Sequence, residues 1–187
     1  PPMKLLNSRV VWSGKWRVRV DTFQLPDGSR FERGAIEHPG AVVLVPLLAV
    51  DDGFPAVLML RQFRPALGQT ILELPAGTRD PEEAWIECAQ RELREETGYR
   101  ATELVSLGEV WPAPGLSNER MALFLAGGLE AAPLPMDIDE EIIIETWRLD
   151  ELVEMALDGR LEDAKSVAAV LRTAHHLAQS AGSGSEL

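Results

Sequence analysis

The chain is poor in cysteine and has no long apolar run. Cys88 is the only cysteine, which excludes an intrachain disulfide and removes any need for an oxidising compartment. No stretch approaches the 18 apolar residues of a transmembrane helix, and the first residues lack the apolar run of a signal peptide. We therefore expect a cytoplasmic protein without a membrane-spanning segment.

Positive charge and histidine are also scarce. The chain has 18 lysines and arginines against 30 aspartates and glutamates, and its net charge is −12. This balance argues against nonspecific binding to nucleic acid or to anionic membranes. The three histidines (His38, His175 and His176) show no metal-ligand spacing with one another, so we expect structural or surface roles for them. With 187 residues, 45% of them hydrophobic, the chain is able to bury a core.

Residues 1–40 are predicted to form a small antiparallel β subdomain. Trp16, Val18 and Val20 alternate with charged residues, which is the period-two pattern of a half-buried strand. A turn signal at residues 26–29 leads to a partner strand at 31–37.

Residues 41–179 are predicted to form the main domain, followed by a disordered tail at 180–187. Apolar runs predict buried strands in the first part of this domain, and helical periodicity predicts two closing helices, at about 150–157 and 163–179. The pattern predicts an α/β fold, an α/β/α sandwich with a mixed sheet.

The most informative feature is a set of glutamates in a helix predicted to run from about Pro81 to Gly98. Glu92, Glu95 and Glu96 fall at i, i+3 and i+4, so their carboxylates share one stripe. Like charges at this spacing repel, and a hard cation such as Mg²⁺ removes the conflict by binding carboxylate oxygens. The sequence therefore predicts a divalent-metal site, with a solvated acidic helix as the alternative.

The segment from Gly77 to Tyr99, GTRDPEEAWIECAQRELREETGY, resembles the signature of the Nudix hydrolases. It matches at every specified position, with a bulky Tyr99 where an aliphatic residue is commoner. Nudix enzymes hydrolyse a nucleoside diphosphate linked to another group X, with Mg²⁺ or Mn²⁺. The resemblance implies the same chemistry here, with more than one ion in the site.

The resemblance also assigns roles within this segment. It implies that Glu92 and Glu96 are the principal metal ligands, that Glu95 assists them in catalysis, and that the backbone carbonyl of Ala76 completes the site. Arg91 lies four residues before Glu95, and we predict that it fixes the carboxylate geometry; the alternative is an ordinary surface ion pair.

Three other residues of the segment have predicted structural roles. Glu83 either supports the metal ligands or stabilises the loop. Gly77 is expected to permit a tight strand-to-helix loop, and Gly98 to end the helix.

A second acidic segment, MDIDEEIIIE at residues 136–145, precedes an apolar strand. By resemblance, Glu141 is the predicted catalytic base, with Asp139 and Glu140 as neighbouring candidates. Such a loop would bring a carboxylate within reach of the attacking water. The alternative is a solvated turn.

A narrower resemblance, over about residues 35–175, points to the ADP-ribose pyrophosphatase branch of this family. It is carried by Pro114, sixteen residues after Gly98, in the segment WPAPGLSNE, and by the segments RQFRP at 61–65 and ELPAG at 73–77. It implies the following substrate-binding residues: Arg64 beside the phosphates, Glu119 at the terminal ribose, and Arg61, Pro114 and Gly115 around them. Pro114 and Gly115 also fit a plain turn.

Members of this branch are homodimers that exchange N-terminal β segments and donate an aromatic ring to the partner's adenine. Trp16, Phe23 and Phe31 are the candidates, and packing roles are equally compatible with each ring. The resulting hypothesis is Mg²⁺-dependent hydrolysis of ADP-ribose to AMP and ribose 5-phosphate. The alternatives are another nucleotide sugar or dinucleotide (GDP-mannose, FAD, NADH), or a catalytically silent ligand sensor.

Overall fold

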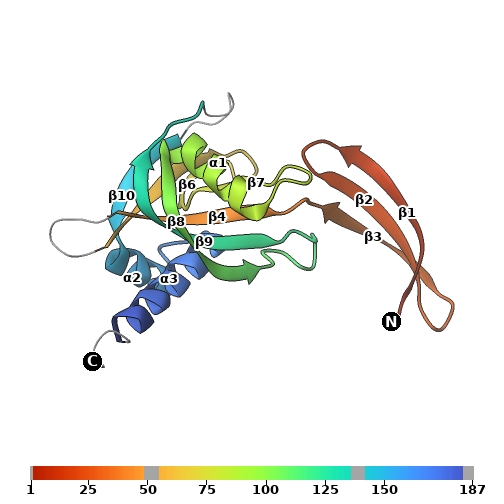
Figure 1. Cartoon of the computed structure of the whole chain (residues 1–187). Helices are drawn as coiled ribbons and strands as arrows, with labels where there is room; N and C mark the ends of the chain where they lie inside the picture. The colour runs from red at the N-terminus through yellow and green to blue at the C-terminus, as the bar shows by residue number, and fades with distance from the viewer. Residues whose placement is uncertain (1, 49–54, 136–141, 183–187) are drawn as a thin grey trace. The chain divides into compact units, whose positions relative to one another are not determined.

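The computed structural model describes residues 2–48, 55–135 and 142–182 (Figure 1). The chain separates into two compact units. The first contains residues 1–40 and 111–120, and the second contains residues 41–110 and 121–187.

The first unit contains a three-stranded antiparallel sheet in the order β1-β2-β3. Its strands are β1 (Lys4–Ser13), β2 (Arg17–Gln24) and β3 (Arg30–Glu37). The alternation that predicted β2 and the turn that predicted β3 are confirmed; in that turn Ser29 donates its backbone N–H to the Asp27 carboxylate at 2.9 Å. The sequence did not predict β1, whose register shifts between Leu5 and Asn7 and between Val10 and Trp12 break the period-two pattern.

The loop at residues 111–120 belongs to this first unit because it pairs with the end of β3. Ile36 and Ser117 form a parallel bridge. The backbone N–H of Ile36 donates to the carbonyl of Leu116 at 2.9 Å, and the N–H of Asn118 donates to the carbonyl of Ile36 at 3.2 Å. These bonds fix the loop that contains Pro114 and Gly115.

The second unit contains a seven-stranded sheet, and this sheet is mixed, as the sequence predicted. The central order is β10-β5-β4-β9-β8, with β6 paired to β5 and β7 paired to β4. β4 and β9 run parallel, and the other pairs are antiparallel. The strands are β4 (Ala41–Leu48), β5 (Ala56–Arg64), β6 (Gln69–Glu73), β7 (Ala76–Thr78), β8 (Tyr99–Val110), β9 (Met121–Ala131) and β10 (Ile142–Arg148).

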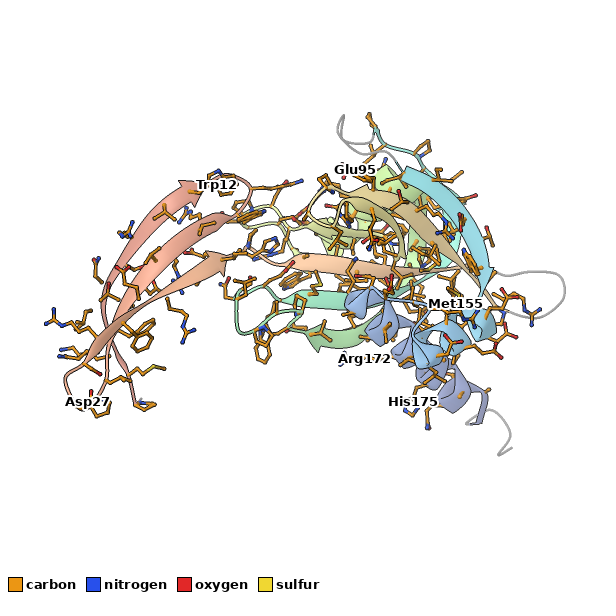
Figure 2. The ribbon with its side chains drawn as sticks, turned by 180° about the vertical axis from the view of Figure 1, so that it is seen from behind. Trp12, Asp27, Glu95, Met155, Arg172 and His175 are labelled. Atoms are coloured by element: carbon orange, nitrogen blue, oxygen red, sulfur yellow. The ribbon has the colours of Figure 1, made fainter. Side chains whose placement is uncertain are left out.

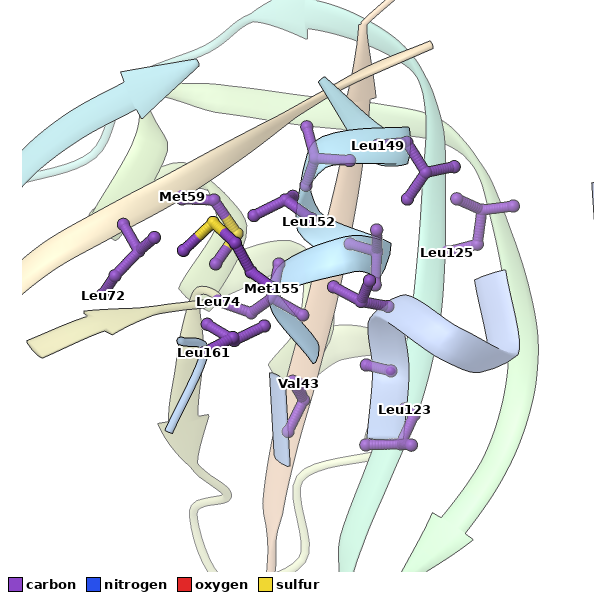
Figure 3. Packing of buried hydrophobic residues seen from close by; sticks show 14 residues of the cluster. Val43, Met59, Leu72, Leu74, Leu123, Leu125, Leu149, Leu152, Met155 and Leu161 are labelled. Carbon is purple, nitrogen blue, oxygen red and sulfur yellow. The ribbon is translucent and has the colours of Figure 1, made fainter. Parts of the chain in front are cut away.

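The central strand β4 buries side chains on both faces of this sheet, which explains its nearly continuous apolar sequence. Val43 and Val45 pack in one core with side chains of α2 (Leu149–Asp158) and α3 (Ala164–Gly182) (Figure 3). Val42 and Leu44 pack in a second core with α1 (Trp85–Thr97). The helices therefore cover opposite faces, α1 on one and α2 with α3 on the other (Figure 1), and the predicted sandwich is confirmed.

The ends of α1 differ in how well the sequence predicted them. Gly98 ends the helix as expected, in the left-handed conformation with φ 78°. The predicted start near Pro81 was wrong, because Glu82 has a φ of 67° and the helix begins at Trp85. The first turn is capped from within, since the Glu87 carboxylate accepts the backbone N–H of Ala84 at 3.2 Å.

The helices in the described residues include none that is long and apolar enough to cross a membrane. α3 includes residues 180–182, and the rest of the predicted tail, 183–187, lies outside the described residues.

Candidate active site

The glutamate stripe lies along α1, beside the segment that contains β7. Cys88, Ala89 and Leu93 anchor the helix in the core against β4, so the carboxylates on the neighbouring stripe lie at the edge of that core. Glu92 is 8% exposed and Glu96 is 3% exposed, while the Glu95 side chain is more accessible, at 26% (Figure 2). Burying two carboxylates is costly unless each has a partner.

Gly77 makes room for the first of these carboxylates. A Cβ atom at this position would lie 1.8 Å from Cδ of Glu92 and about as close to both carboxylate oxygens. The Glu92 carboxylate therefore lies directly against the backbone of β7. Glycine is needed here because it has no Cβ, and not because of its backbone conformation, since its φ is not positive.

Glu96 is held by the residue before Gly77. The backbone N–H of Ala76 donates to the Glu96 carboxylate at 2.8 Å. Ala76 itself pairs with Val43 of the central strand. The C-terminal turn of α1 is thus fixed to the sheet at the position where the sequence predicted a metal ligand.

Arg91 is the common partner of the remaining acids. Its guanidinium donates to Glu92 at 2.6 Å, to Glu95 at 3.0 Å, and to both oxygens of Glu83 at 2.8 and 2.9 Å. It also donates to the carbonyl of Thr78 at 3.2 Å. An ordinary surface i,i+4 pair would contact only one acid, so the contacts favour the role of fixing the carboxylates.

Glu83 joins this arrangement from the loop before α1. The Arg91 hydrogen bonds, together with one from the backbone N–H of Asp80 at 3.0 Å, lower the pKa of Glu83 to about 2. The sequence offered two alternative roles for Glu83, and the contacts fit both. Glu83 supports the predicted metal ligands by holding Arg91, and it stabilises the loop through Asp80. Arg91 has a raised pKa, caused first by its hydrogen bonds to Glu83.

The donor set suits a hard divalent cation. Within the described ranges, no three histidine, cysteine, aspartate or glutamate side chains are grouped closely enough to hold a metal ion. Glu92 and Glu95 accept hydrogen bonds from Arg91, and Glu96 accepts one from the backbone N–H of Ala76. Glu92, Glu95 and Glu96 all offer carboxylate oxygens from one helical stripe. The Glu92 carboxylate occupies the space that a side chain at position 77 would fill. They are the residues that could hold a divalent cation.

Arg61 and Arg64, the two arginines predicted to bind the substrate, lie on β5, and each is paired with a glutamate. Arg64 donates Nε and Nη2 to the buried Glu73 at 2.8 and 2.7 Å. Arg61 donates Nε to Glu145 of β10 at 2.6 Å. Sequence reasoning assigned no role to Glu73 or Glu145, since a strand acid gives no sign of its partner on another strand.

Glu119, Pro114 and Gly115 belong to the first unit. Pro114 and Gly115 help to line a cavity of about 470 Å³, whose other walls include Arg19, Phe23, Arg33 and Trp111. His38 lies close to Glu119, with 3.6 Å between Nδ1 and the carboxylate. Burial lowers the pKa of His38 and the charge of Glu119 opposes that shift, so His38 is no isolated surface residue.

The predicted aromatic candidates fall into two pairs in the first unit. Trp16 lies against Trp12, with 4.6 Å between ring centroids, and Phe23 stacks on Phe31 at 5.6 Å. Phe23 alone of the three candidates lines the cavity described above. The predicted base candidates Asp139, Glu140 and Glu141 lie outside the described residues.

Comparison with known proteins agrees with the geometry. The NUDIX domain family matches residues 38–170. The chain is 32% identical to an ADP-ribose pyrophosphatase of Bacillus subtilis, over 89% of this chain and 90% of that protein. It is 31% identical to a methanol dehydrogenase activator of Bacillus methanolicus, with the same coverage. A crystal structure of an ADP compounds hydrolase superposes with a TM-score of 0.80 at 25% identity, covering 96% of each chain.

We predict that Gly77→Ala displaces the Glu92 carboxylate and weakens Mg²⁺ binding by about 10- to 100-fold. The added methyl group meets the mobile end of a side chain, so the fold should persist while the ligand moves. Isothermal titration with Mg²⁺ and a thermal melt would measure both effects. Gly127→Ala is the matched control, because its Cβ would make only ordinary contacts of 3.7 and 3.9 Å. Equal Mg²⁺ affinity in both variants would contradict this role for Gly77.

We predict that Glu83→Gln costs about 2 kcal/mol of unfolding free energy at pH 7 and progressively less in acid. The folded-state pKa of Glu83 is lowered to about 2, so its stabilisation is fully present above its ordinary pKa of 4.5. It is lost as the pH falls from there towards 2. Urea unfolding of both proteins between pH 7 and pH 3 would measure the difference. A gap that stays constant over this range would show that ionised Glu83 contributes nothing.

Proposed function

Because this chain belongs to the Nudix hydrolase family, we propose that it hydrolyses ADP-ribose to AMP and ribose 5-phosphate in a Mg²⁺-dependent reaction. The observation that carries the proposal is the seating of Glu92 against Gly77, with Glu95 and Glu96 on the same stripe of α1. The choice of ADP-ribose is supported by the similarity to an ADP-ribose pyrophosphatase and to an ADP compounds hydrolase.

The protein's own groups divide the work on a charged diphosphate. When bound, Mg²⁺ supplies charge neutralisation and acidifies a coordinated water. Arg91 keeps the carboxylates of Glu92 and Glu95 in place, and the Ala76 N–H orients Glu96. Arg64 offers a planar guanidinium suited to phosphate oxygens. The proton of the attacking water is assigned to an acid among Asp139, Glu140 and Glu141, as the sequence predicts.

The first unit supports a site for the nucleoside. Its cavity combines aromatic rings, Phe23 and Trp111, with the guanidinium groups of Arg19 and Arg33. A purine stacks on flat rings, and sugar hydroxyls donate to carboxylates such as that of Glu119. The groups of the first unit are therefore chemically suited to a nucleoside.

We also propose that the protein is a homodimer formed through β1. Every residue of β1 is exposed, and Val10, Val11 and Trp12 are 54%, 48% and 49% exposed. An exposed apolar strand of this length is a pairing surface, since isolated proteins rarely leave one uncovered. The partner is a second copy of this chain, as the family resemblance implies.

Two other functions are compatible with the site. The carboxylates would act on the diphosphate rather than on the group X, so another nucleotide sugar or a dinucleotide would use the same carboxylates. A binding role without turnover is the second rival, since one similar protein is named as an enzyme activator. The intact stripe of Glu92, Glu95 and Glu96 favours turnover.

The substrate is tested by parallel turnover assays with ADP-ribose, GDP-mannose, FAD and NADH, each with Mg²⁺ and with EDTA. We expect ADP-ribose to give AMP at the highest kcat/KM, with activity lost in EDTA. Chromatography would identify the released nucleotide. Faster GMP release from GDP-mannose would overturn the choice of substrate. Tight ADP-ribose binding without turnover in either Mg²⁺ or Mn²⁺ would establish the silent sensor instead.

The oligomeric state is tested by light scattering coupled to size exclusion. We expect the wild-type protein at twice the chain mass, and Val10→Asp at the chain mass, because a charge on β1 opposes apolar pairing. Leu157→Asp, at an apolar residue of α2 that is 73% exposed, is the matched control and should stay dimeric. A monomeric wild-type protein, or a Val10→Asp variant that remains dimeric, would refute the proposed interface.

A further inference from the structure

Four charged residues of the second unit form a continuous network. Glu73 accepts Nε and Nη2 of Arg64 at 2.8 and 2.7 Å, and it also accepts Nζ of Lys165 at 2.5 Å. Lys165 donates in turn to Asp163 at 2.9 Å. Two cations and two anions alternate, so the network is neutral overall.

The centre of this network, formed by Glu73 and Lys165, is buried, and burying charged groups is costly. Glu73 is 1% exposed and Lys165 is 8% exposed, and the flanking Leu72 and Leu74 belong to the apolar core. Buried ion pairs add little net stability compared with well-packed apolar side chains of similar volume. Stability alone is therefore a poor reason for placing four charges here, and a geometric role explains them better.

In the part of the chain that the structure describes, the network fixes one edge of Arg64 and leaves the other available. Glu73 takes Nε and Nη2, which defines the plane of the guanidinium, and Nη1 is the nitrogen not bound to it. The Arg64 side chain remains 38% exposed. Burial lowers the pKa of Arg64, but the Glu73 hydrogen bonds and charge outweigh it and raise the pKa overall, with a further contribution from Glu96. Arg64 thus lies within electrostatic reach of a carboxylate of the stripe.

Glu73 itself is held from both sides. The next residue, Leu74, donates its backbone N–H to Oγ of Ser166 at 2.7 Å. Ser166 donates its own N–H to Asp163 at 3.1 Å and its hydroxyl to the same carboxylate at 2.5 Å, at the start of α3. The end of β6 is therefore fixed to α3, and Glu73 has little freedom to follow Arg64 if that side chain moves.

We propose that Glu73 is a positioning residue, which holds Arg64 through Nε and Nη2 so that Nη1 is presented to the substrate diphosphate. This inference rests on the proposed function. Lys165 and Asp163 balance the charge of Glu73 and fix its position, while contacting no substrate. Without Glu73, the guanidinium is free to turn towards the carboxylates of the stripe, where it binds no phosphate.

The test compares Glu73→Gln, Arg64→Ala and the combination of both. Glu73→Gln leaves surplus positive charge in the core, so the double variant Glu73→Gln/Lys165→Gln is included because it keeps the network neutral. Glu130→Gln is the matched control: it alters an Arg–Glu pair of the same kind on the surface, where Arg100 donates Nε at 2.9 Å. Each variant is assayed for steady-state kinetics and for ADP affinity in the absence of metal.

We expect the neutral double variant to bind ADP about tenfold more weakly, as Arg64→Ala does, since each loses about one charge-assisted contact. KM for the substrate should rise by a similar factor while kcat changes less than threefold. Adding Arg64→Ala to the Glu73 variants should cause no further loss, because both changes remove the same contact. The proposal would be overturned if the losses of ADP affinity from Glu73→Gln and Arg64→Ala were fully additive. It would also be overturned if folded Glu73→Gln/Lys165→Gln bound ADP as tightly as the wild-type protein.

A wild-type measurement covers the case in which the Glu73 variants do not fold. The Arg64 Nε–Hε signal, assigned by its absence in Arg64→Lys, should show a guanidinium that rotates slowly and shifts on adding ADP. Free rotation, or no shift at saturating ADP, would overturn the proposal. Because ADP binding needs no turnover, the positioning role is separable from the proposed activity: a protein that hydrolyses no substrate in the panel still tests it.

Discussion

Three carboxylates on one turn of α1 repel one another, and the surrounding residues of the second unit are arranged to offset this repulsion. Glu92, Glu95 and Glu96 lie where like charges destabilise a helix, and two of them are buried. The protein meets this cost with one shared guanidinium and one backbone N–H. Arg91 is in turn neutralised by Glu83, so the loop before the helix is tied to the same charges. Each of the three carboxylates thereby has a hydrogen-bond donor in the protein.

A second group of charged residues centres on Glu73, which lies close in the sequence to Ala76 and Gly77. Glu73 precedes this pair by three residues and connects β5 to the start of α3 through Arg64 and Lys165. The short segment from 73 to 77 therefore carries two kinds of constraint: ion pairs at its beginning and close backbone contacts at its end. Such a segment places its groups with little freedom, which is the preorganisation that electrostatic catalysis requires.

The sequence predicted the features that depend on neighbouring residues, and it did not predict the contacts between residues that are far apart in the chain. Periodicity and turn residues located β2, β3 and the end of α1 at Gly98, because these depend on nearby residues. The start of α1 was missed because Pro81 suits a first helical turn, whereas Glu82 adopts a left-handed conformation that no rule for its residue type favours. The partners of Glu73 were out of reach, since Lys165 follows 92 residues later. The glutamate stripe was found because its members share one helix.

The bridge between Ile36 and Ser117 has a consequence for how the chain is made. The first unit needs residues from both sides of a 70-residue interval, residues 41–110, that belongs to the second unit. During translation its sheet emerges from the ribosome early, yet its last segment is synthesised only after α1 and β8. The parallel pair of β4 and β9 also forms only after this interval has been synthesised, since Ala41 pairs with Met121. The first unit is therefore completed only when residue 120 has been made, and the second later still, after α3. Long-range closure of this kind is slow.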